Sequence, residues 1–233
     1  MMQYHLLGAG SSIAKLLAKK LESNNSVNLY STSGFGQGLN KFFENSIEGS
    51  VVIYFCNIQD DLNGNLTLLA EVIEYCKQFK CQFFYISSIN AETPDASLYS
   101  KIKFECERIV NANGYIWIRL AVVVAEPPFS SYKSLKVLRE MPIKLAFPKT
   151  QYLHFTDINN FLNIDFSNLH ANKRLYSSSM RLNDFIEGGP KKLFKINIGW
   201  LIGVLRKLNH FYLMKSIFGR LLTLTAFNRD LLK

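Results

Sequence analysis

Two side chains in the middle of the chain, Tyr99 and Lys103, have types and a spacing suited to acid and base chemistry. Residues four apart on a helix share a face, so the hydroxyl and the ammonium would project to the same side. A nearby ammonium stabilises the phenolate form of tyrosine, which makes the phenol usable as a general acid and base near neutral pH. The pair Ser87-Ser88 ends the preceding apolar run, and a serine hydroxyl there can hydrogen-bond the same substrate oxygen.

The same spacing occurs a second time, at Tyr132 and Lys136. Such pairs arise by chance in a chain this rich in tyrosine and lysine, so the sequence around each pair decides between them. Tyr99 follows a predicted strand and opens a predicted helix, whereas Tyr132 follows a proline-rich segment after the last core strand. We therefore assign the acid and base role to Tyr99 and Lys103.

A glycine-rich turn near the N-terminus, Gly8-Ala-Gly10-Ser-Ser-Ile-Ala14, predicts a binding site for a dinucleotide. Glycine permits a sharp turn and lets a pyrophosphate approach main-chain N–H groups, and the start of the following helix adds partial positive charge. Because Ile13 stands where the strict GxGxxG pattern has its third glycine, a purely structural turn is the alternative. The predicted contacts in the turn are Gly8, Gly10, Ser11, Ser12 and Ile13.

The residues after the second strand bear on the choice of cofactor. NAD-binding turns place an Asp or Glu there, about 20 residues beyond the glycine turn, to bind the adenosine ribose hydroxyls. This sequence has Ser31 and Thr32 instead, which we expect beside the ribose. The missing carboxylate removes a repulsion of the 2′-phosphate of NADP, and Lys15 is the one basic residue nearby. The sequence therefore predicts NADP or NAD, with a slight preference for NADP.

Alternating strand and helix patterns predict the fold that holds these residues. Apolar runs predict strands at 27–30, 51–55, 83–86 and 116–124, and helical spacing predicts helices at 39–43, 66–79 and 98–110. This alternation is typical of an α/β fold with a Rossmann-type doubly wound parallel sheet. We expect an NAD(P)-binding Rossmann core over residues 1–128 and an abbreviated, mainly helical substrate-binding lobe over residues 129–233.

Composition bounds the class of protein. A chain of 233 residues with 48% hydrophobic residues can bury one substantial core. No stretch reaches the ~18 uninterrupted apolar residues that a membrane span requires. The first strand begins at once and leaves no room for a signal peptide, so we expect a cytoplasmic protein. The cysteines lack the spacing of zinc ligands, so we expect no metal site and reduced packing residues at Cys56, Cys76, Cys81 and Cys106.

The C-terminal tail concentrates the positive charge. Residues 191–233 hold nine Lys or Arg and one acidic residue, and so carry +8 of the formal net charge of +9. Apolar residues recur at helical spacing in 198–208 and 214–221, which predicts amphipathic helices with a basic face. That face could remain in solvent, line the diphosphate of a substrate, or contact an anionic membrane peripherally. We do not expect nucleic-acid binding, because the aromatic residues of the tail are placed for packing.

The order of motifs over about residues 3–128 resembles the extended short-chain dehydrogenase family, the NAD(P)-dependent epimerases and dehydratases of nucleotide sugars. The motifs are GAGSSIA, VVIYFCN, NLTLLAEVIEYCKQFKCQFFYISSINA, YSKIKFECERIV and IWIRLAVVVAEP. The resemblance implies that Ser88, Tyr99 and Lys103 are catalytic and that Asn65 is the family's helix asparagine. It further implies cofactor contacts at Phe55, Cys56, Asn57, Ser87, Tyr99 and Lys103.

The same resemblance implies a function and partners. The expected activity is that of an NAD(P)-dependent epimerase, dehydratase or keto-reductase acting on a nucleotide-activated sugar, in the synthesis of a surface polysaccharide such as O-antigen or capsule. A homodimer would form through helices 66–79 and 98–110. Residues 154–157 resemble the segment that precedes a helix in the sugar-binding half.

The chain also departs from the family. Its lobe is shorter than usual, and Val122, Val124 and Ala125 stand where polar and aromatic substrate contacts and a glycine are common. These departures leave two alternatives. One is a catalytically inactive dinucleotide-binding sensor or scaffold of the same fold, and the other is a reductase of a small carbonyl compound that is not a sugar.

Overall fold

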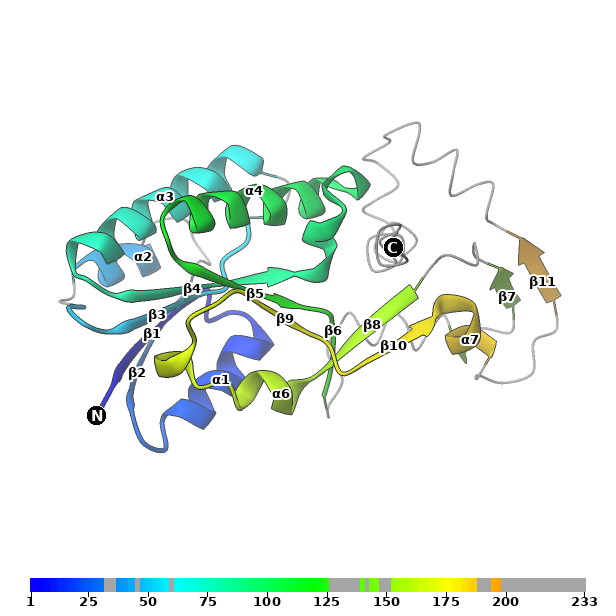
Figure 1. Ribbon diagram of the computed structural model, residues 1–233, viewed down its shortest axis with the longest axis horizontal. Coiled ribbons are helices and arrows are strands. Elements are labelled where there is room, and N and C mark those ends of the chain that lie inside the picture. The colour runs from blue at the N-terminus through cyan, green and yellow to red at the C-terminus, as the bar shows by residue number, and fades with distance from the viewer. Residues whose placement is uncertain are drawn as a thin grey trace.

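The computed structural model describes residues 1–31, 37–44, 47–58, 61–125, 139–140, 143–146, 152–187 and 194–197. Its centre is a six-stranded parallel sheet in the order β2-β1-β3-β4-β5-β9 (Figure 1). The strands are β1 (Gln3–Leu7), β2 (Ser26–Tyr30), β3 (Val51–Tyr54), β4 (Gln82–Ser88), β5 (Ile116–Leu120) and β9 (Lys173–Leu175). The strand order reverses between β1 and β3, and in doubly wound sheets such a reversal leaves a crevice beyond the carboxyl ends of the strands.

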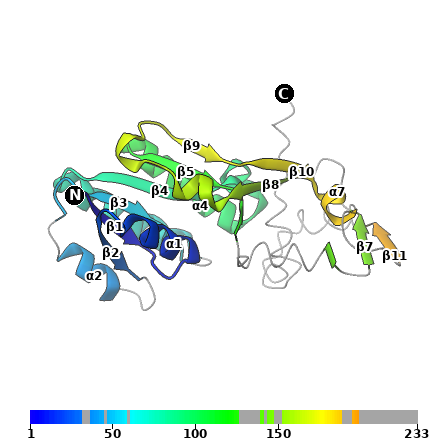
Figure 2. The same ribbon diagram turned by 90° about the horizontal axis from the view of Figure 1, so that it is seen from below.

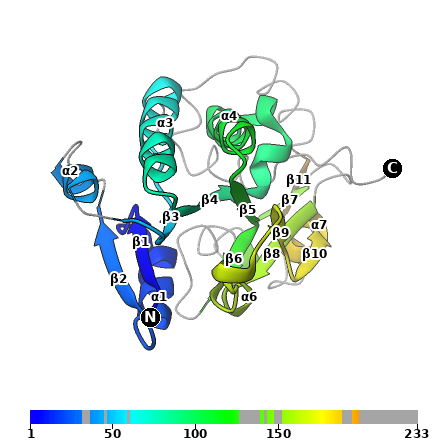
Figure 3. The ribbon, with the colours of Figure 1, turned by 60° about the vertical axis from the view of Figure 1, so that its left-hand side comes forward.

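Helices cover both faces of this sheet (Figure 3). Those on one face are α1 (Ser12–Leu21) and α6 (Ile158–Leu162), and those on the other are α2 (Gln37–Phe43), α3 (Leu62–Gln78) and α4 (Leu98–Ala112). Strand residues alternate between the two faces: Val52 and Tyr54 belong to the core under α3 and α4, whereas Val51 and Ile53 belong to the core under α1 and α6. The sheet is therefore buried on both sides, as the apolar runs of its strands predict.

Side-chain caps fix the starts of α3 and α4. The Asp61 carboxylate accepts a hydrogen bond from the Gly64 amide at 2.9 Å, and the Ser97 hydroxyl accepts one from the Ser100 amide at 3.0 Å. Each bond satisfies an N–H group that a helix start otherwise leaves without a partner. The α4 cap places Tyr99 in the first turn of its helix, at the end nearest the crevice.

The sequence predicted one strand over 116–124, and this prediction was wrong. The structure has two strands, β5 and β6 (Val122–Val124), which belong to different sheets. Ala121 separates them, because its N–H donates to the Thr156 hydroxyl at 3.0 Å. β6 then pairs in parallel with β8 (Tyr152–Asp157), and β10 (Ser178–Arg181) completes this three-stranded sheet.

The segment after residue 128 contributes to the core as well as to a lobe. β9 lies beside β5 in the central sheet, and Phe161 and Phe166 pack in the same core as Leu6. The lobe elements β10, α7 (Leu182–Glu187) and the parallel pair of β7 (Ile143–Ala146) and β11 (Phe194–Asn197) extend from one end of the sheet (Figure 2). Strands thus occur here besides helices, and the helices predicted at 198–208 and 214–221 lie outside the described residues.

All four cysteines are free and buried, and they pack in the core under α3 and α4. Within the described ranges, no helix is long and apolar enough to cross a membrane. In those ranges, too, no three His, Cys, Asp or Glu side chains gather where they could hold a metal ion.

Candidate active site

The carboxyl ends of β1, β3 and β4 lie side by side at the crevice of the sheet. Residues predicted to bind or catalyse lie at each end: 8–13 follow β1, 55–57 follow β3, and the pair Ser87-Ser88 closes β4. After β4 the chain passes through two short helices, η1 (Ile89–Glu92) and η2 (Pro94–Ala96), into α4. α4 then brings Tyr99 and Lys103 back to the end of β4.

Gly8 is required by the close approach of two backbone segments. Its φ is +93°, a conformation that L side chains rarely adopt. A Cβ on this residue would lie 2.9 Å from the Cys56 nitrogen and 2.9 Å from the Phe55 carbonyl carbon. The Gly8 and Ala9 amides both donate to the Tyr30 carbonyl, at 2.8 and 3.0 Å. Gly8 therefore joins the ends of β1, β2 and β3.

Among the described residues, nothing crowds the rest of the turn. A Cβ on Gly10 would meet no described atom within 4 Å. Ser11 is the N-cap residue of α1, and its side chain makes no cap hydrogen bond in the described structure. The amides of Ser12 and Ile13, at the start of the helix, therefore receive no side-chain cap from Ser11. Such amides at a helix start attract anions. Ile13 keeps its side chain in the core under α1, which explains how an apolar residue fits at the place of the third glycine.

The residues after β3 lie beside the glycine turn, at the carboxyl end of the strand next to β1. Phe55 donates its amide to the Leu7 carbonyl at 2.7 Å, which continues the pairing of β3 with β1. Burial raises the pKa of the Cys56 thiol to about 12, so this side chain stays neutral and is not a nucleophile. The Asn57 Oδ1 is buried and has no hydrogen-bond partner in the described part of the chain. An acceptor of this kind can receive a hydroxyl of a bound ligand.

Asn65, the helix asparagine of the resemblance, holds the turn between β3 and α3. Its Oδ1 accepts the Ile58 amide at 2.9 Å, and its Nδ2 donates to the carbonyls of Ile58 and Asp61 at 2.7 and 2.5 Å. The residue is buried. Its observed contacts therefore fix the backbone beside the crevice.

Lys103 is the buried cation of the site, with 4% of its surface exposed. Its Nζ donates to the Ile86 carbonyl of β4 at 3.2 Å. The same Nζ lies 4.8 Å from the centre of the Tyr85 ring and 5.8 Å from the centre of the Tyr99 ring. A buried ammonium needs such acceptors and ring faces to offset its lost hydration. The structure thus places Tyr99 and Lys103 on one side of α4, as their four-residue spacing predicts.

Two tyrosines flank this ammonium, and their surroundings differ. Tyr85 is fully buried, and burial raises its pKa well above the ordinary value. Tyr99 is 36% exposed and stands at the start of α4. Because proton exchange with a substrate requires access, Tyr99 is the tyrosine of this pair that can act as an acid or base.

The two serines at the end of β4 have different environments. The Ser88 hydroxyl accepts the Asn90 amide at 3.3 Å and so caps η1. The Ser87 hydroxyl is buried and unpaired among the described residues. Ser88 is half-buried. It lies two positions after Ile86, whose carbonyl accepts the hydrogen bond from the Lys103 ammonium. The end of β4 therefore carries both the predicted serine and the anchor of the predicted lysine.

A pocket of about 830 Å³ lies between β6, β8, β10 and α7. The chain leaves the carboxyl end of β5 through β6, and the last residue of β6, Val124, lines the pocket together with Ala125. Its volume falls within the roughly 300–1,000 Å³ that small-molecule sites occupy. The lining residues are Val124, Ala125, Arg139, Phe155, Asp157, Ile158, Asn159, Ser177, Ser178, Met180, Asp184 and Phe185.

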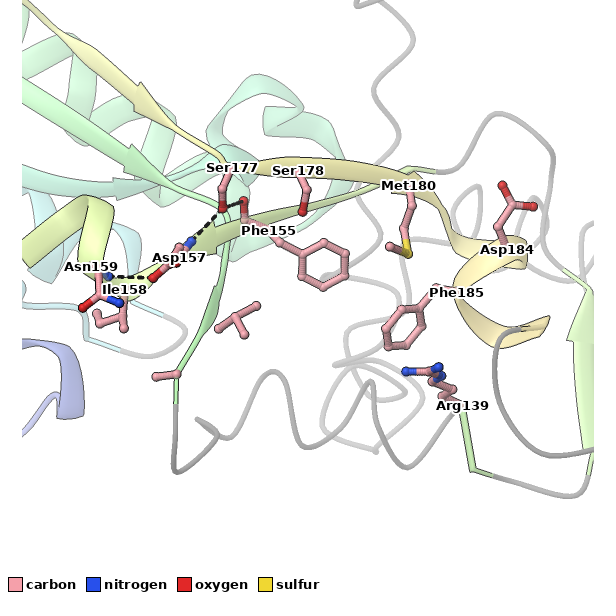
Figure 4. Close-up of a pocket in the computed structure, with 12 residues that line it drawn as sticks. Arg139, Phe155, Asp157, Ile158, Asn159, Ser177, Ser178, Met180, Asp184 and Phe185 are labelled. Atoms are coloured by element: carbon pink, nitrogen blue, oxygen red, sulfur yellow. Dashed lines mark hydrogen bonds between the residues drawn. The ribbon is translucent and has the colours of Figure 1, made fainter.

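The polar groups of the pocket gather at its two ends (Figure 4). At one end, the Asp157 carboxylate accepts the Asn159 amide at 2.8 Å and caps α6, and the Asp157 amide donates to the Ser177 hydroxyl at 2.8 Å. At the other end, the Arg139 guanidinium lies 5.4 Å from the centre of the Phe185 ring, and Asp184 lies on the opposite side of that ring. The rings of Phe155 and Phe185, 5.9 Å apart, form an apolar wall between the ends.

Some predicted residues lie outside the described structure, and some pocket residues were not predicted. Thr32, the second pair Tyr132 and Lys136, and most of the basic tail fall in the first group, whereas Ser31 is described at the end of β2. Arg139 and Asp184 come from distant parts of the sequence, and no motif marks them. The alternation of apolar and polar residues over 153–156 could have indicated the strand that carries Phe155, which the sequence analysis did not predict.

No protein-family model matches the sequence, and no curated protein matches it either. Several solved structures match the fold. A nucleoside-diphosphate-sugar epimerase from Staphylococcus aureus has a TM-score of 0.67 at 13% identity, over 98% of this chain and 92% of that chain. A dTDP-glucose 4,6-dehydratase from Bacillus anthracis, solved in complex with NAD, has a TM-score of 0.65 at 10% identity, over 85% of each chain.

A dTDP-4-dehydrorhamnose reductase from Bacillus anthracis, solved in complex with NADP, has a TM-score of 0.62 at 10% identity, also over 85% of each chain. The matched regions cover most of every chain, so the likeness extends beyond the central parallel sheet. This chain therefore has the Rossmann-type α/β fold of these epimerase, dehydratase and reductase structures.

Proposed function

We propose that this chain is an NAD(P)-dependent enzyme that epimerises, dehydrates or reduces a nucleotide-activated sugar. One observation carries the proposal: a glycine turn, a buried Lys103 beside an accessible Tyr99, and a ligand-sized pocket all lie beyond one edge of a parallel sheet. The structures that share its fold are named as enzymes of such sugars, and two of them were solved with NAD or NADP.

The crevice fits a dinucleotide. The open space beside Gly10 and the helix amides of Ser12 and Ile13 suit the pyrophosphate, and the unpaired Asn57 oxygen suits a ribose hydroxyl. The sequence from Tyr30 to residue 36 contains no Asp or Glu, so no carboxylate repels a 2′-phosphate. We therefore favour NADP slightly over NAD.

The residues of the chain have distinct roles in this proposal. When bound, the nicotinamide would give or take a hydride. Tyr99 exchanges a proton at its hydroxyl with the sugar hydroxyl or ketone, and Lys103 keeps positive charge near the phenol. Ser88, at the end of β4, orients the same substrate oxygen.

The pocket beyond β6 suits the nucleotide-sugar substrate. Arg139 brings positive charge for a diphosphate, and Phe155 and Phe185 give an apolar wall for the less polar parts of the ligand. We place this activity in the synthesis of a surface polysaccharide. A homodimer would use α3 and α4, which lie side by side on one face of the sheet (Figure 3).

A second candidate is a dinucleotide-binding sensor or scaffold without catalysis. Val124 and Ala125 favour it, because they give apolar surface to the pocket at positions where the family resemblance implies polar or aromatic substrate contacts. The sensor would bind NADP or NAD but convert no sugar. This outcome separates the two candidates.

Replacing Tyr99 tests the proposed acid and base. We expect Tyr99→Phe to lower kcat by roughly 10²- to 10⁴-fold with little change in dinucleotide affinity, because only the exchangeable proton is lost. Turnover of a panel of nucleotide sugars and NADPH titration by fluorescence measure the two quantities. Tyr132→Phe, in the second pair of the same spacing, is the matched control and should leave both unchanged. Equal turnover by wild type and Tyr99→Phe would refute the assignment.

A further inference from the structure

A buried network of ion pairs surrounds Arg119 of β5. Its Nε and Nη2 donate to the two carboxylate oxygens of Glu107 at 2.8 and 2.6 Å, and its Nη1 donates to Glu92 at 3.1 Å. Arg119 is 8% exposed and Glu107 is 3% exposed. Arg174 of β9 contacts the same Glu92 oxygen at 3.1 Å, so two arginines balance two carboxylates. The guanidinium also lies 4.5 Å from the centre of the Trp117 ring.

One arm of the network holds the helix that carries Tyr99. Glu107 follows Lys103 by one helical turn, and both side chains lie on the buried face of α4. Lys103 binds the Ile86 carbonyl of β4, and Glu107 binds the guanidinium of Arg119 in β5. α4 is therefore attached to two neighbouring strands at two successive turns, which restricts both its sliding and its rotation.

The other arm holds the turn that carries Ser88. Glu92 is the last residue of η1, the short helix that the Ser88 hydroxyl caps. Arg119 also lies directly across from Ser87 in the pairing of β5 with β4. A single guanidinium thus connects the helix of Tyr99 and Lys103 to the turn of Ser88.

The cost of burial argues that the network does more than stabilise the fold. Removing paired charges from water costs free energy that their attraction roughly repays, and buried pairs can often be replaced by apolar residues without loss of stability. Fixed relative geometry is what such a network adds, because a bidentate guanidinium pair is directional. Acid and base groups need that geometry, since displacement by about 1 Å can cost about 10²-fold in rate.

We infer that Arg119 is a positioning residue, which aligns Tyr99 and Lys103 with Ser88 through Glu107 and Glu92. This inference rests on the proposed function for its effect on turnover. The effect of Arg119 on geometry can be observed without turnover. The positioning role and the proposed function can therefore fail separately.

The test is Arg119→Lys, which keeps the charge but loses the bidentate fork. We expect kcat for the nucleotide sugar to fall roughly 10- to 100-fold. KM and the dissociation constant of NADPH should stay within about threefold, because the glycine turn and the pocket do not touch Arg119. Arg108→Lys makes the same exchange in an exposed ion pair with Glu105 on α4, and should change neither quantity. A purely structural role would weaken binding and turnover together.

Hydrogen exchange supplies the readout that needs no turnover. In Arg119→Lys, the amides of η1 and of residues 98–103 should exchange roughly tenfold faster than in wild type and in Arg108→Lys. Unchanged exchange in these segments overturns the inference, whether or not the protein converts a sugar. Faster exchange in a protein that converts no sugar would refute the proposed function and leave the positioning role standing. If Arg119→Lys does not fold, Glu92→Gln gives the same two readouts, because it removes the charge that pairs η1 with Arg119 and Arg174 and leaves the bidentate pair of Arg119 with Glu107 in place.

Discussion

At the scale of single residues, the two glycines of the N-terminal turn are expected to behave differently. Gly8→Ala puts a Cβ 2.9 Å from backbone atoms at a positive φ, so we expect it to lower the free energy of unfolding by about 1–3 kcal/mol. Gly10→Ala meets no described atom and should leave that free energy within about 0.5 kcal/mol of wild type. It should nevertheless weaken NADPH binding, because the methyl group occupies the space proposed for the pyrophosphate. Urea unfolding and fluorescence titration measure the two effects, and equal dinucleotide affinity for wild type and Gly10→Ala would contradict the binding site.

His5 is the residue that predicts a dependence of stability on pH. It is fully buried in β1, where its Nδ1 lies 3.0 Å from the Tyr30 hydroxyl, and burial lowers its pKa from 6.5 to about 4. As the pH falls below about 6.5, the unfolded chain takes up a proton that the folded chain does not. The stabilising effect of neutral His5 is therefore complete above pH 6.5 and is lost between pH 6.5 and 4, by up to about 3 kcal/mol.

Urea midpoints measured from pH 7 to pH 4 check this prediction. His5→Leu removes the titrating group and should flatten the profile in that window, whereas His170→Leu, at an exposed position, should leave the slope as in wild type. A profile that is as steep in His5→Leu as in wild type would show that other groups cause the loss.

At the scale of elements, Asn65 is expected to hold the turn between β3 and α3. Asn65→Ala removes the buried side chain that bonds the Ile58 amide and carbonyl and the Asp61 carbonyl, so the free energy of unfolding should fall by about 1–3 kcal/mol. Asn63→Ala, at an exposed position of the same helix, is the control. Urea unfolding gives the free energies, and hydrogen exchange at Ile58 should rise only in Asn65→Ala. Equal stability of the two variants would contradict the role of Asn65.

Elements with long periodic patterns could be predicted from the sequence, and the break in a continuous apolar run could not. The helices at 66–79 and 98–110 were predicted because their apolar residues recur with the helical period. In the structure, these apolar residues pack on one side of the sheet. The run 116–124 was predicted as one strand because Ala121 does not interrupt its hydrophobicity. Its break depends on Thr156, which is 35 residues away in sequence, and no local pattern reveals such a partner.

At the scale of the whole molecule, the sequence predicted which motif-bearing strand ends come together, because parallel strands end at one edge of the sheet. The position of Lys103 beside Tyr99 follows from helix geometry alone. The pocket does not, since Arg139, Phe155 and Asp184 meet only after β6, β8 and α7 come together. The anchoring of α4 through Arg119 is likewise tertiary, although Glu107 continues the four-residue spacing of Tyr99 and Lys103.

The central claim is that this molecule carries out nicotinamide chemistry on a nucleotide-activated sugar. The most direct measurement incubates the purified wild-type protein with NADP or NAD, in oxidised and reduced form, and with a panel of nucleotide sugars, and identifies the products by NMR and mass spectrometry. Product analysis is needed because epimerisation returns the cofactor unchanged, whereas reduction consumes it. We predict that at least one sugar is converted and that Tyr99→Phe slows the conversion by roughly 10²- to 10⁴-fold. Tight dinucleotide binding with every sugar recovered unchanged would contradict the account and favour the sensor.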